Sequence, residues 1–129
     1  MIHVSVAGAT GRMGALTKGL IDADSNLKLH SALDSSSAAT EMLGADVVVD
    51  FTNHAVSQEL VEFAIANDVK IVVGTSGWSE QKLASLEKLL LKHPSAGVVV
   101  VPNFSIGSML AQQFAAQAAQ YFDSIEILE

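Results

Sequence analysis

Short runs of β-branched residues alternate along the chain with longer stretches whose apolar residues recur at helical spacing. Five of the runs have the length of a strand, and the stretches between them have the length of helices. Such alternation is typical of repeated βαβ units, so it predicts a parallel sheet with helices on both faces. The predicted strands are residues 2–7, 27–33, 47–50, 70–73 and 97–101.

The fifth predicted strand contains four consecutive valines at positions 98–101, a pattern typical of a strand that is covered on both faces. Capping residues predict the helix ends: Asn53 and Ser79 are placed to begin helices, and Pro94 is placed to stop one. The predicted helices are residues 12–23, a short one near 38–43, and residues 55–67, 79–93 and 108–122.

The composition fits a single compact domain, because the 129 residues are 50% hydrophobic and 16% charged. Seven Lys and Arg stand against fourteen Asp and Glu, and this net charge of −7 disfavours binding to nucleic acid or to an anionic membrane. The absence of cysteine excludes disulfides and thiol nucleophiles, and the four histidines lack a metal-ligand spacing. With no apolar run of membrane-spanning length and no signal-peptide pattern after Met1, we expect a cytoplasmic protein without a metal site.

Three glycines, Gly8, Gly11 and Gly14, follow the first predicted strand and open the first predicted helix. In such a turn one glycine permits the tight reversal, another lets the backbone approach a pyrophosphate, and a third lets the helix pack closely on the strand. The free N–H groups and the helix dipole then favour phosphate charge without a lysine. Because the spacing is one residue longer than the usual dinucleotide fingerprint, a plain turn without a ligand stays open as the alternative.

Asp34 supports the ligand interpretation of this turn, because it ends the second predicted strand, twenty residues beyond Gly14. An acidic side chain at this place accepts hydrogen bonds from the ribose hydroxyls of an adenosine. No Arg or Lys lies between Lys28 and Lys70 to pair with a 2′-phosphate, so the sequence favours NADH over NADPH. Use of NADPH stays open, because Arg12 is placed to reach a phosphate.

Polar loops follow the third, fourth and fifth predicted strands, at the edge where open α/β sheets bind ligands. In residues 74–77 two glycines flank hydroxyl residues, whose donors would meet the carboxamide of a nicotinamide. Phe104 would pack against the nicotinamide ring. Taken singly, each loop is equally explained as an ordinary polar turn. We expect Asp50 to cap the following loop or helix rather than act as a catalytic acid, His54 to cap or face solvent, and Trp78 to pack.

Together these features predict a doubly wound, Rossmann-like α/β domain over residues 1–129. Residues 124–128 alternate like the start of a sixth strand, and dinucleotide folds commonly have six. We therefore expect the first part of a longer protein, cut at this strand, with Leu128 and Glu129 open to a vector origin. The helix at 108–122 is expected to be a core or interdomain helix with apolar surface that a missing part would cover.

Four motifs carry a family resemblance: V-S-V-A-G-A-T-G-R-M-G at 4–14, V-D-F-T at 49–52, V-G-T-S-G at 73–77 and P-N-F-S-I-G at 102–107. In this order they resemble the amino-terminal nucleotide-binding domain of the 4-hydroxy-tetrahydrodipicolinate reductases. The resemblance covers essentially the whole chain, although Ser76 stands where the family usually has a second Thr.

The resemblance implies a homotetrameric oxidoreductase of lysine and diaminopimelate synthesis that uses NAD(P)H. The hydride of this cofactor reduces a cyclic dicarboxylate, which loses water to give tetrahydrodipicolinate. The family's substrate-binding and proton-donating motif begins beyond the strand that opens at Ile125, so no catalytic residue is expected in this chain, which alone should be inactive. The cofactor-binding residues that the resemblance implies are Gly8, Ala9, Thr10, Gly11, Arg12, Met13, Asp34, Phe51, Gly74, Thr75, Ser76, Val101, Pro102, Asn103 and Phe104.

Two alternatives remain at the level of the sequence. The first is a stand-alone dinucleotide-binding or redox-sensing module that acts through a partner protein. The second is a relative of the semialdehyde or homoserine dehydrogenases, which the P-N-F-S-I-G run disfavours.

Overall fold

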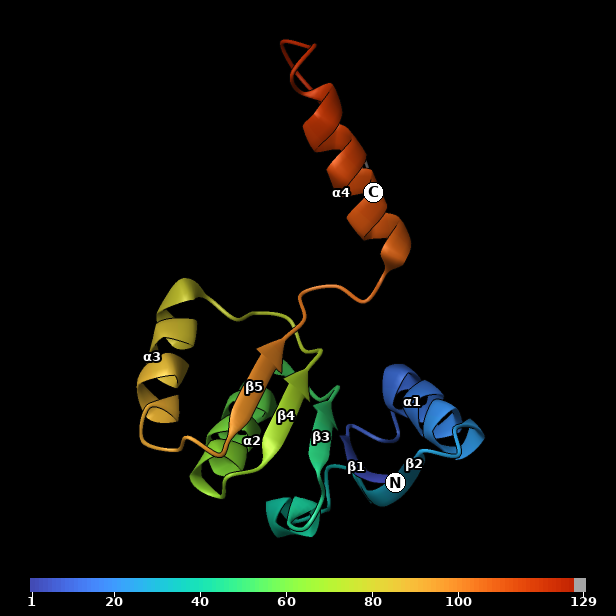
Figure 1. Ribbon diagram of the computed structural model, residues 1–129, viewed down its shortest axis with the longest axis vertical. Coiled ribbons are helices and arrows are strands. Elements are labelled where there is room, and N and C mark those ends of the chain that lie inside the picture. The colour runs from blue at the N-terminus through green and yellow to red at the C-terminus, as the bar shows by residue number, and fades with distance from the viewer. Residues whose placement is uncertain (127–129) are drawn as a thin grey trace.

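The computed structural model describes residues 1–126, which form a five-stranded, wholly parallel sheet (Figure 1). The chain begins in the middle of the sheet, adds one strand on one side, and then crosses back to add three on the other, which is the predicted doubly wound topology. The strands are β1 (Ile2–Ala7), β2 (Leu27–Leu33), β3 (Val47–Asp50), β4 (Lys70–Val73) and β5 (Gly97–Val100), in the order β2-β1-β3-β4-β5.

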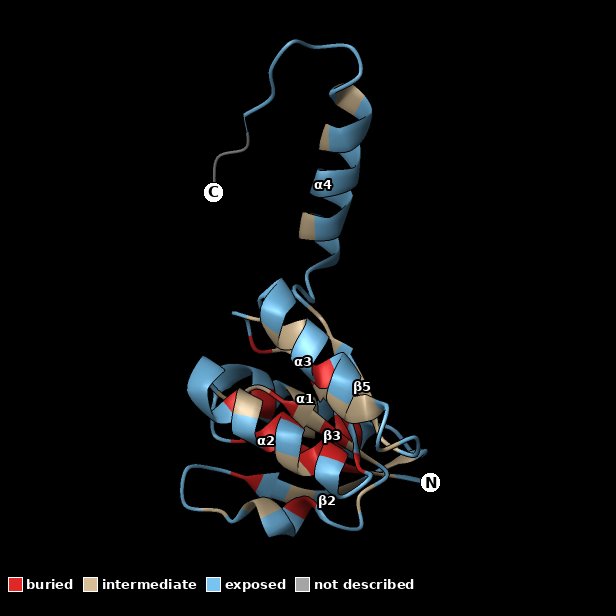
Figure 2. Ribbon diagram, turned by 90° about the vertical axis from the view of Figure 1, so that its left-hand side faces the viewer, coloured by how far each residue is buried: buried red, intermediate tan, exposed pale blue. Residues whose placement is uncertain are grey.

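Helices cover both faces of the sheet, but unequally. One helix packs on β1 and β2, whereas two others and a short 3₁₀ helix contribute to the larger core on the opposite face (Figures 1 and 2). Each βαβ crossover brings its helix back over the sheet, so the face that a helix covers follows from the direction in which the chain adds strands. The helices are α1 (Arg12–Ala23), the 3₁₀ helix η1 (Ala39–Met42), α2 (His54–Ala66), α3 (Glu80–Leu90) and α4 (Ile106–Ala118).

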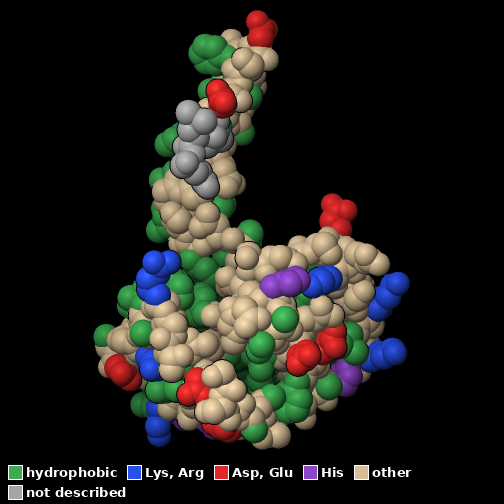
Figure 3. Space-filling view, turned by 180° about the vertical axis from the view of Figure 1, so that it is seen from behind, with side chains coloured by type: hydrophobic (Ala, Val, Ile, Leu, Met, Phe, Trp, Pro, Cys, Tyr) green, Lys and Arg blue, Asp and Glu red, His purple; other side chains and the backbone are tan. Residues whose placement is uncertain are grey.

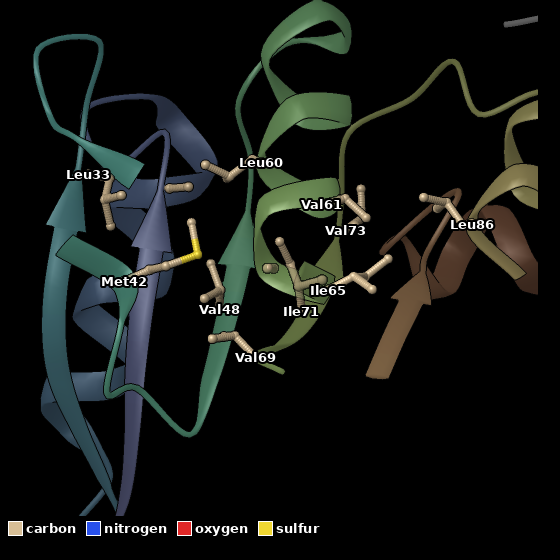
Figure 4. Packing of buried hydrophobic residues seen from close by; sticks show 12 residues of the cluster. Leu33, Met42, Val48, Leu60, Val61, Ile65, Val69, Ile71, Val73 and Leu86 are labelled. Atoms are coloured by element: carbon tan, nitrogen blue, oxygen red, sulfur yellow. The ribbon is translucent and has the colours of Figure 1, made fainter. Parts of the chain in front are cut away.

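The main core lies between the sheet and α2. Val48 of β3 and Ile71 of β4 meet Ile65 of α2 there, and all three side chains are almost completely buried (Figure 4). A smaller cluster around Val6 and Ile21 joins α1 to the other face. The β3–β4 part of the sheet is therefore firmly held, and the loops at its carboxyl edge start from rigid strands.

The prediction that the valine run is covered on both faces is wrong for β5. Val99 is 57% exposed, while Val98 and Val100 pack against the main core. The helices α2 and α3 cover one face of this edge strand, and no described segment covers the other. A run of valines shows that both faces of a strand are hydrophobic. It does not show whether another element packs against each face.

Capping residues set the helix ends. Asn53 accepts the N–H groups of Ala55 and Val56, and Ser79 accepts that of Lys82, so both predicted caps are confirmed. The helix predicted to reach residue 93 ends earlier, at Leu90. The helix predicted to begin at residue 108 begins at Ile106, because Ser105 accepts the N–H of Ser108 and caps it.

The helix α4 projects away from the sheet instead of packing into the core (Figure 2). None of its residues is buried, and Phe114 is 62% exposed. Apolar side chains gather along this projecting column (Figure 3). Of the two expected roles, the core helix is therefore wrong and the interdomain helix stays a prediction, whereas the expected exposed apolar surface is present.

The predicted sixth strand is not seen in residues 124–126, and the rest of it lies outside the described residues. Among the helices of residues 1–126, none has the length and apolar character needed to cross a membrane.

Ile65→Ala should lower the free energy of unfolding by about 2–5 kcal/mol, because it leaves a cavity in the main core. The matched control Ile106→Ala removes the same atoms from a side chain that is 78% exposed. It should change the free energy of unfolding by less than about 0.5 kcal/mol. Urea unfolding of both variants measures the difference, and equal losses would contradict the assigned core.

Candidate functional site

The carboxyl ends of β1, β2 and β3 meet around two adjoining hollows. The first, of about 300 Å³, is named here the turn hollow. The second, of about 320 Å³, lies against α2 and is named the α2 hollow. Both lie at the point where the chain reverses its direction across the sheet, between β1 and β3, which is where open α/β sheets bind ligands. The two hollows share Gly8, Asp34, Thr52 and Val56.

The glycine turn packs too tightly for side chains at two of its positions. Gly8 has a φ of +74°, and a Cβ there would lie 2.5 Å from the carbonyl oxygen of Phe51. A Cβ on Gly14 would overlap the carbonyl oxygen of Gly8, so the first turn of α1 rests directly on the strand end. Gly8 and Gly14 thus have the reversal and close-packing roles expected of them, and β1, α1 and the loop after β3 are held together by backbone contact.

The amino end of α1 carries no side-chain cap. Gly11 is its N-cap and makes no side-chain hydrogen bond, and the first turn contains no acidic residue. Thr10, Gly11, Arg12 and Met13 are all exposed, and Thr10 and Gly11 line the turn hollow. An uncapped helix end of this kind presents N–H groups and a positive partial charge, which suits an anion.

Asp34 stands at the end of β2 with one carboxylate oxygen engaged and the other open. Its Oδ1 accepts the hydroxyl of Ser36 at 2.7 Å and the backbone N–H of Ser36 at 2.8 Å. These bonds, the hydroxyl first, lower the pKa of Asp34, so the group is ionised at neutral pH. Within residues 1–126 no donor meets its Oδ2, which is therefore available to a ligand's hydroxyl groups.

The lining of both hollows is acidic. Asp34 lines both, Glu59 lines the α2 hollow, and no Lys or Arg is among the described residues that line either. Sequence reasoning missed Val56 and Glu59, which enter the site from the face of α2. The N-cap at Asn53 predicts that Val56 and Glu59 share one face of the helix, but it carries no information on what that face lies against.

Asp50 is completely buried at the end of β3 and joins three segments. Its Oδ1 accepts the N–H of Thr52 at 2.8 Å and the Thr52 hydroxyl at 2.6 Å. Its Oδ2 accepts the hydroxyl of Ser57 in α2 and that of Thr75, at 3.2 Å, after β4. The expectation that Asp50 caps the following loop or helix is confirmed for the loop, through the N–H of Thr52, whereas α2 is capped by Asn53 and is joined to Asp50 only through the Ser57 side chain. The network also reaches the next loop along the sheet.

Two aromatic rings close over Gly74. The centroids of Phe51 and Phe104 lie 5.6 Å apart in an edge-to-face arrangement with an interplanar angle of 62°. A Cβ on Gly74 would overlap the Phe51 ring and come within 2.8 Å of Phe104. The loops after β3, β4 and β5, which lie far apart in the sequence, therefore meet at one place.

A third hollow of about 350 Å³ lies beside these loops and is lined by Thr75, Ser76, Trp78 and Pro102 among others. Trp78 packs against the main core, as expected, although its indole N–H meets no acceptor among the described residues. The hydroxyl of Thr75 is turned inward to Asp50, so its backbone is the part left for a ligand.

Several other predicted site residues act through main-chain groups or hydrogen-bond to the main chain of the loop before α4. Ala9 is buried, so only its main chain can face a ligand. The Val101 N–H donates to the carbonyl of Val73 at 2.8 Å. Asn103 accepts the N–H of Ser105 at 2.7 Å and donates to the hydroxyl of Ser108 at 2.8 Å, so its amide shapes the approach to α4.

His54 is exposed at the first position of α2, and its Nε2 lies 2.8 Å from the Nζ of Lys82. The capping is done by Asn53, so the solvent-facing alternative is the one that the structure supports for His54. Among residues 1–126, no group of three or more acidic or histidine side chains could hold a metal ion.

A family profile described as "Dihydrodipicolinate reductase, N-terminus" matches residues 2–104. The chain belongs to this family. The match spans the glycine turn, Asp34 and all three loops that meet at Gly74, so the family and the site coincide in the chain. The resemblance found in the sequence motifs is thereby confirmed.

Individual relatives agree with the family. The 4-hydroxy-tetrahydrodipicolinate reductase of Clavibacter sepedonicus is 48% identical over 98% of this chain and 46% of its own length. That of Cutibacterium acnes is 40% identical over 100% of this chain and 52% of its own. The chain therefore spans about half the length of the curated relatives that it matches.

Solved structures support the same fold. A dipicolinate-bound dihydrodipicolinate reductase from Paenisporosarcina sp. TG-14 has a TM-score of 0.78 and 27% identity, over 95% of this chain and 55% of that one. A myo-inositol 2-dehydrogenase from Lactobacillus plantarum has a TM-score of 0.65 at 13% identity, over 92% of this chain and 42% of that one, and shows the fold alone.

Asp50→Ala should lower the free energy of unfolding by about 3 kcal/mol, because it leaves buried hydroxyl donors without their charged acceptor. Asp22→Ala is the matched control, since Asp22 is exposed on α1, and should change it by less than about 0.5 kcal/mol. Urea unfolding measures both, and a loss for Asp50→Ala no larger than that of the control would refute the role of the network.

Proposed function

We propose that this chain is the NADH-binding part of a 4-hydroxy-tetrahydrodipicolinate reductase. The observation that carries the proposal is the placement of two complementary groups beside one hollow: the uncapped amino end of α1 and the open carboxylate oxygen of Asp34. The first suits a pyrophosphate and the second suits a ribose diol, and adenosine dinucleotides present these groups next to each other. Membership of the reductase family supports the same assignment.

The pyrophosphate is assigned to the glycine turn. The main chain of this segment is exposed at the amino end of α1, and no described acidic side chain competes for the position in the first helical turn. Binding is therefore attributed to N–H groups and the helix dipole, with the guanidinium of Arg12 as an exposed cation at the first position of α1. The residues assigned to the pyrophosphate are Gly8, Ala9, Thr10, Gly11, Arg12 and Met13.

The adenosine ribose is assigned to Asp34, and this assignment carries the preference for NADH. A carboxylate accepts both hydroxyls of an unmodified ribose, whereas a 2′-phosphate would bring negative charge against Asp34 with Glu59 nearby. No described cation lines either hollow to offset that repulsion. Arg12, at the start of α1, leaves a weaker binding of NADPH open.

The nicotinamide is assigned to the place where the three loops meet. The paired rings offer an apolar wall, and the main chain at Thr75 and Ser76 offers amide donors and carbonyl acceptors to the carboxamide. The N–H groups of Gly74 and Val101 are not available, because they already donate to the carbonyl groups of Asp50 and Val73. The residues assigned here are Phe51, Gly74, Thr75, Ser76, Val101, Pro102, Asn103 and Phe104.

The chemistry of the whole enzyme is then hydride transfer from the bound cofactor to a cyclic dicarboxylate, with loss of water to give tetrahydrodipicolinate. We assign no catalytic residue in this chain, because hydride transfer also needs the substrate held and a proton supplied. Both tasks are assigned to the half of the relatives that this chain does not span. The whole enzyme is proposed to be a cytoplasmic homotetramer.

Calorimetric titration of the 129-residue chain should show NADH binding more tightly than NADPH. Asp34→Ala should weaken NADH binding by about tenfold, because it removes hydrogen bonds from the ribose to a charged acceptor. It should also bring the dissociation constants of NADH and NADPH closer together. The exposed Asp22→Ala, which makes the same charge change away from the hollows, serves as control. No binding of either nucleotide, or equal NADH affinity in wild type and Asp34→Ala, would refute the assigned site.

The chain alone should oxidise no NADH in the presence of freshly generated 4-hydroxy-tetrahydrodipicolinate, followed at 340 nm. The full-length Clavibacter sepedonicus reductase serves as the positive control. NADH oxidation by the 129-residue chain that is faster than in buffer alone would contradict the proposal. Substrate chemistry could then not be assigned to the half of the relatives that this chain does not span.

A further inference from the structure

The face of α2 that borders the α2 hollow combines apolar side chains with one carboxylate. Val56, Leu60 and Phe63 line the hollow together with Glu59, at positions that share one helical face. The opposite wall is formed by small and apolar residues, Leu33 among them. Such a wall suits the flat face of an aromatic base, and the carboxylate suits a donor on the edge of that base.

The carboxylate of Glu59 has no partner within residues 1–126. No hydrogen bond and no ion pair to it is formed in this part of the chain, and its side chain is exposed. Glu62, one turn further along, is engaged instead by the amide of Gln58 at 3.1 Å and lines the groove between α2 and α3. The same helix thus offers one open carboxylate toward the hollow and one occupied carboxylate away from it.

The α2 hollow adjoins the proposed ribose position, because Asp34 lines both hollows. We infer that Glu59 selects the base of the bound dinucleotide by accepting a hydrogen bond from the 6-amino group of adenine. This inference rests on the proposed function and deepens it. The base would lie against the apolar side chains of α2, with its amino edge turned to the carboxylate of Glu59.

The chemistry predicts discrimination against hypoxanthine. Adenine carries an amino donor at position 6, whereas hypoxanthine carries a carbonyl oxygen there. A carboxylate only accepts hydrogen bonds, so at position 6 it meets a donor in adenine and another acceptor in hypoxanthine. The N–H at position 1 of hypoxanthine is one ring position away, so a carboxylate placed for the 6-amino group would reach it only after a shift of the base. A glutamine at position 59 would present both an oxygen and an NH₂ group, and by rotating its amide it would accept from one base or donate to the other.

The test compares NADH with reduced nicotinamide hypoxanthine dinucleotide, which differs only at the base. Calorimetry of the 129-residue chain should show roughly tenfold weaker binding of the hypoxanthine nucleotide. Glu59→Ala and Glu59→Gln should each bring the two affinities to within about twofold of each other. The control Glu62→Ala removes the same charge from the same helix and should keep the wild-type ratio.

Equal affinity of the wild-type chain for both nucleotides would overturn the inference while leaving the proposed function intact. A tenfold ratio that persists in Glu59→Ala would also overturn it, because the selectivity would then come from another group. If neither nucleotide binds, the proposed function fails and this inference fails with it. Glu59 is exposed, so loss of folding is not expected, and circular dichroism of each variant verifies this.

Discussion

The buried carboxylate of Asp50 joins the segments around which the candidate site is built. It accepts hydroxyl groups from the loop after its own strand, from α2 and from the loop after β4. A buried carboxyl group is tolerated when its oxygens are well supplied with hydrogen-bond donors, and here those donors come from three separate parts of the chain. The positions of Thr52, α2 and Thr75 are therefore linked through this one group, which lies between the α2 hollow and the loops that meet at Gly74.

The site also shows how an acidic protein can be suited to an anionic cofactor. The net charge is −7, and no described basic side chain lines the two hollows. Attraction for phosphate is assigned to the amino end of α1, where the exposed Gly11 has no side chain and Gly8 and Gly14 let the helix end pack closely on the strand. Fixed dipoles act at short range, so they can hold a phosphate without drawing nucleic acid to the rest of the surface.

Much of this architecture is predictable from local sequence signals. Four of the five strands have the predicted bounds, because a glycine or an acidic residue stands at or just beyond the end of each: Gly8, Asp34, Asp50 and Gly74. Helix ends are predictable where the cap is unambiguous, as at Ser79, and less so where a nearer cap such as Ser105 precedes the expected one. The glycine turn and Asp34 were found because their positions depend only on the strands they follow.

The features that sequence reasoning missed depend on contacts between distant segments. The bare face at Val99 and the projection of α4 depend on which elements lie against them, and a hydrophobic pattern carries no such information. The entry of Glu59 into the site follows from how α2 sits over the β1–β3 edge. The contact of Phe51 with Phe104 joins residues more than fifty positions apart.

That aromatic contact has a mechanical consequence for the long helix beyond it. Phe104 lies two residues before α4. The hydrogen bonds of Asn103 to Ser105 and Ser108 join this loop to the first turn of the helix. The edge-to-face pair therefore connects the residues that precede α4 to the loop after β3. Through this contact the start of the projecting helix is joined to the carboxyl edge of the sheet.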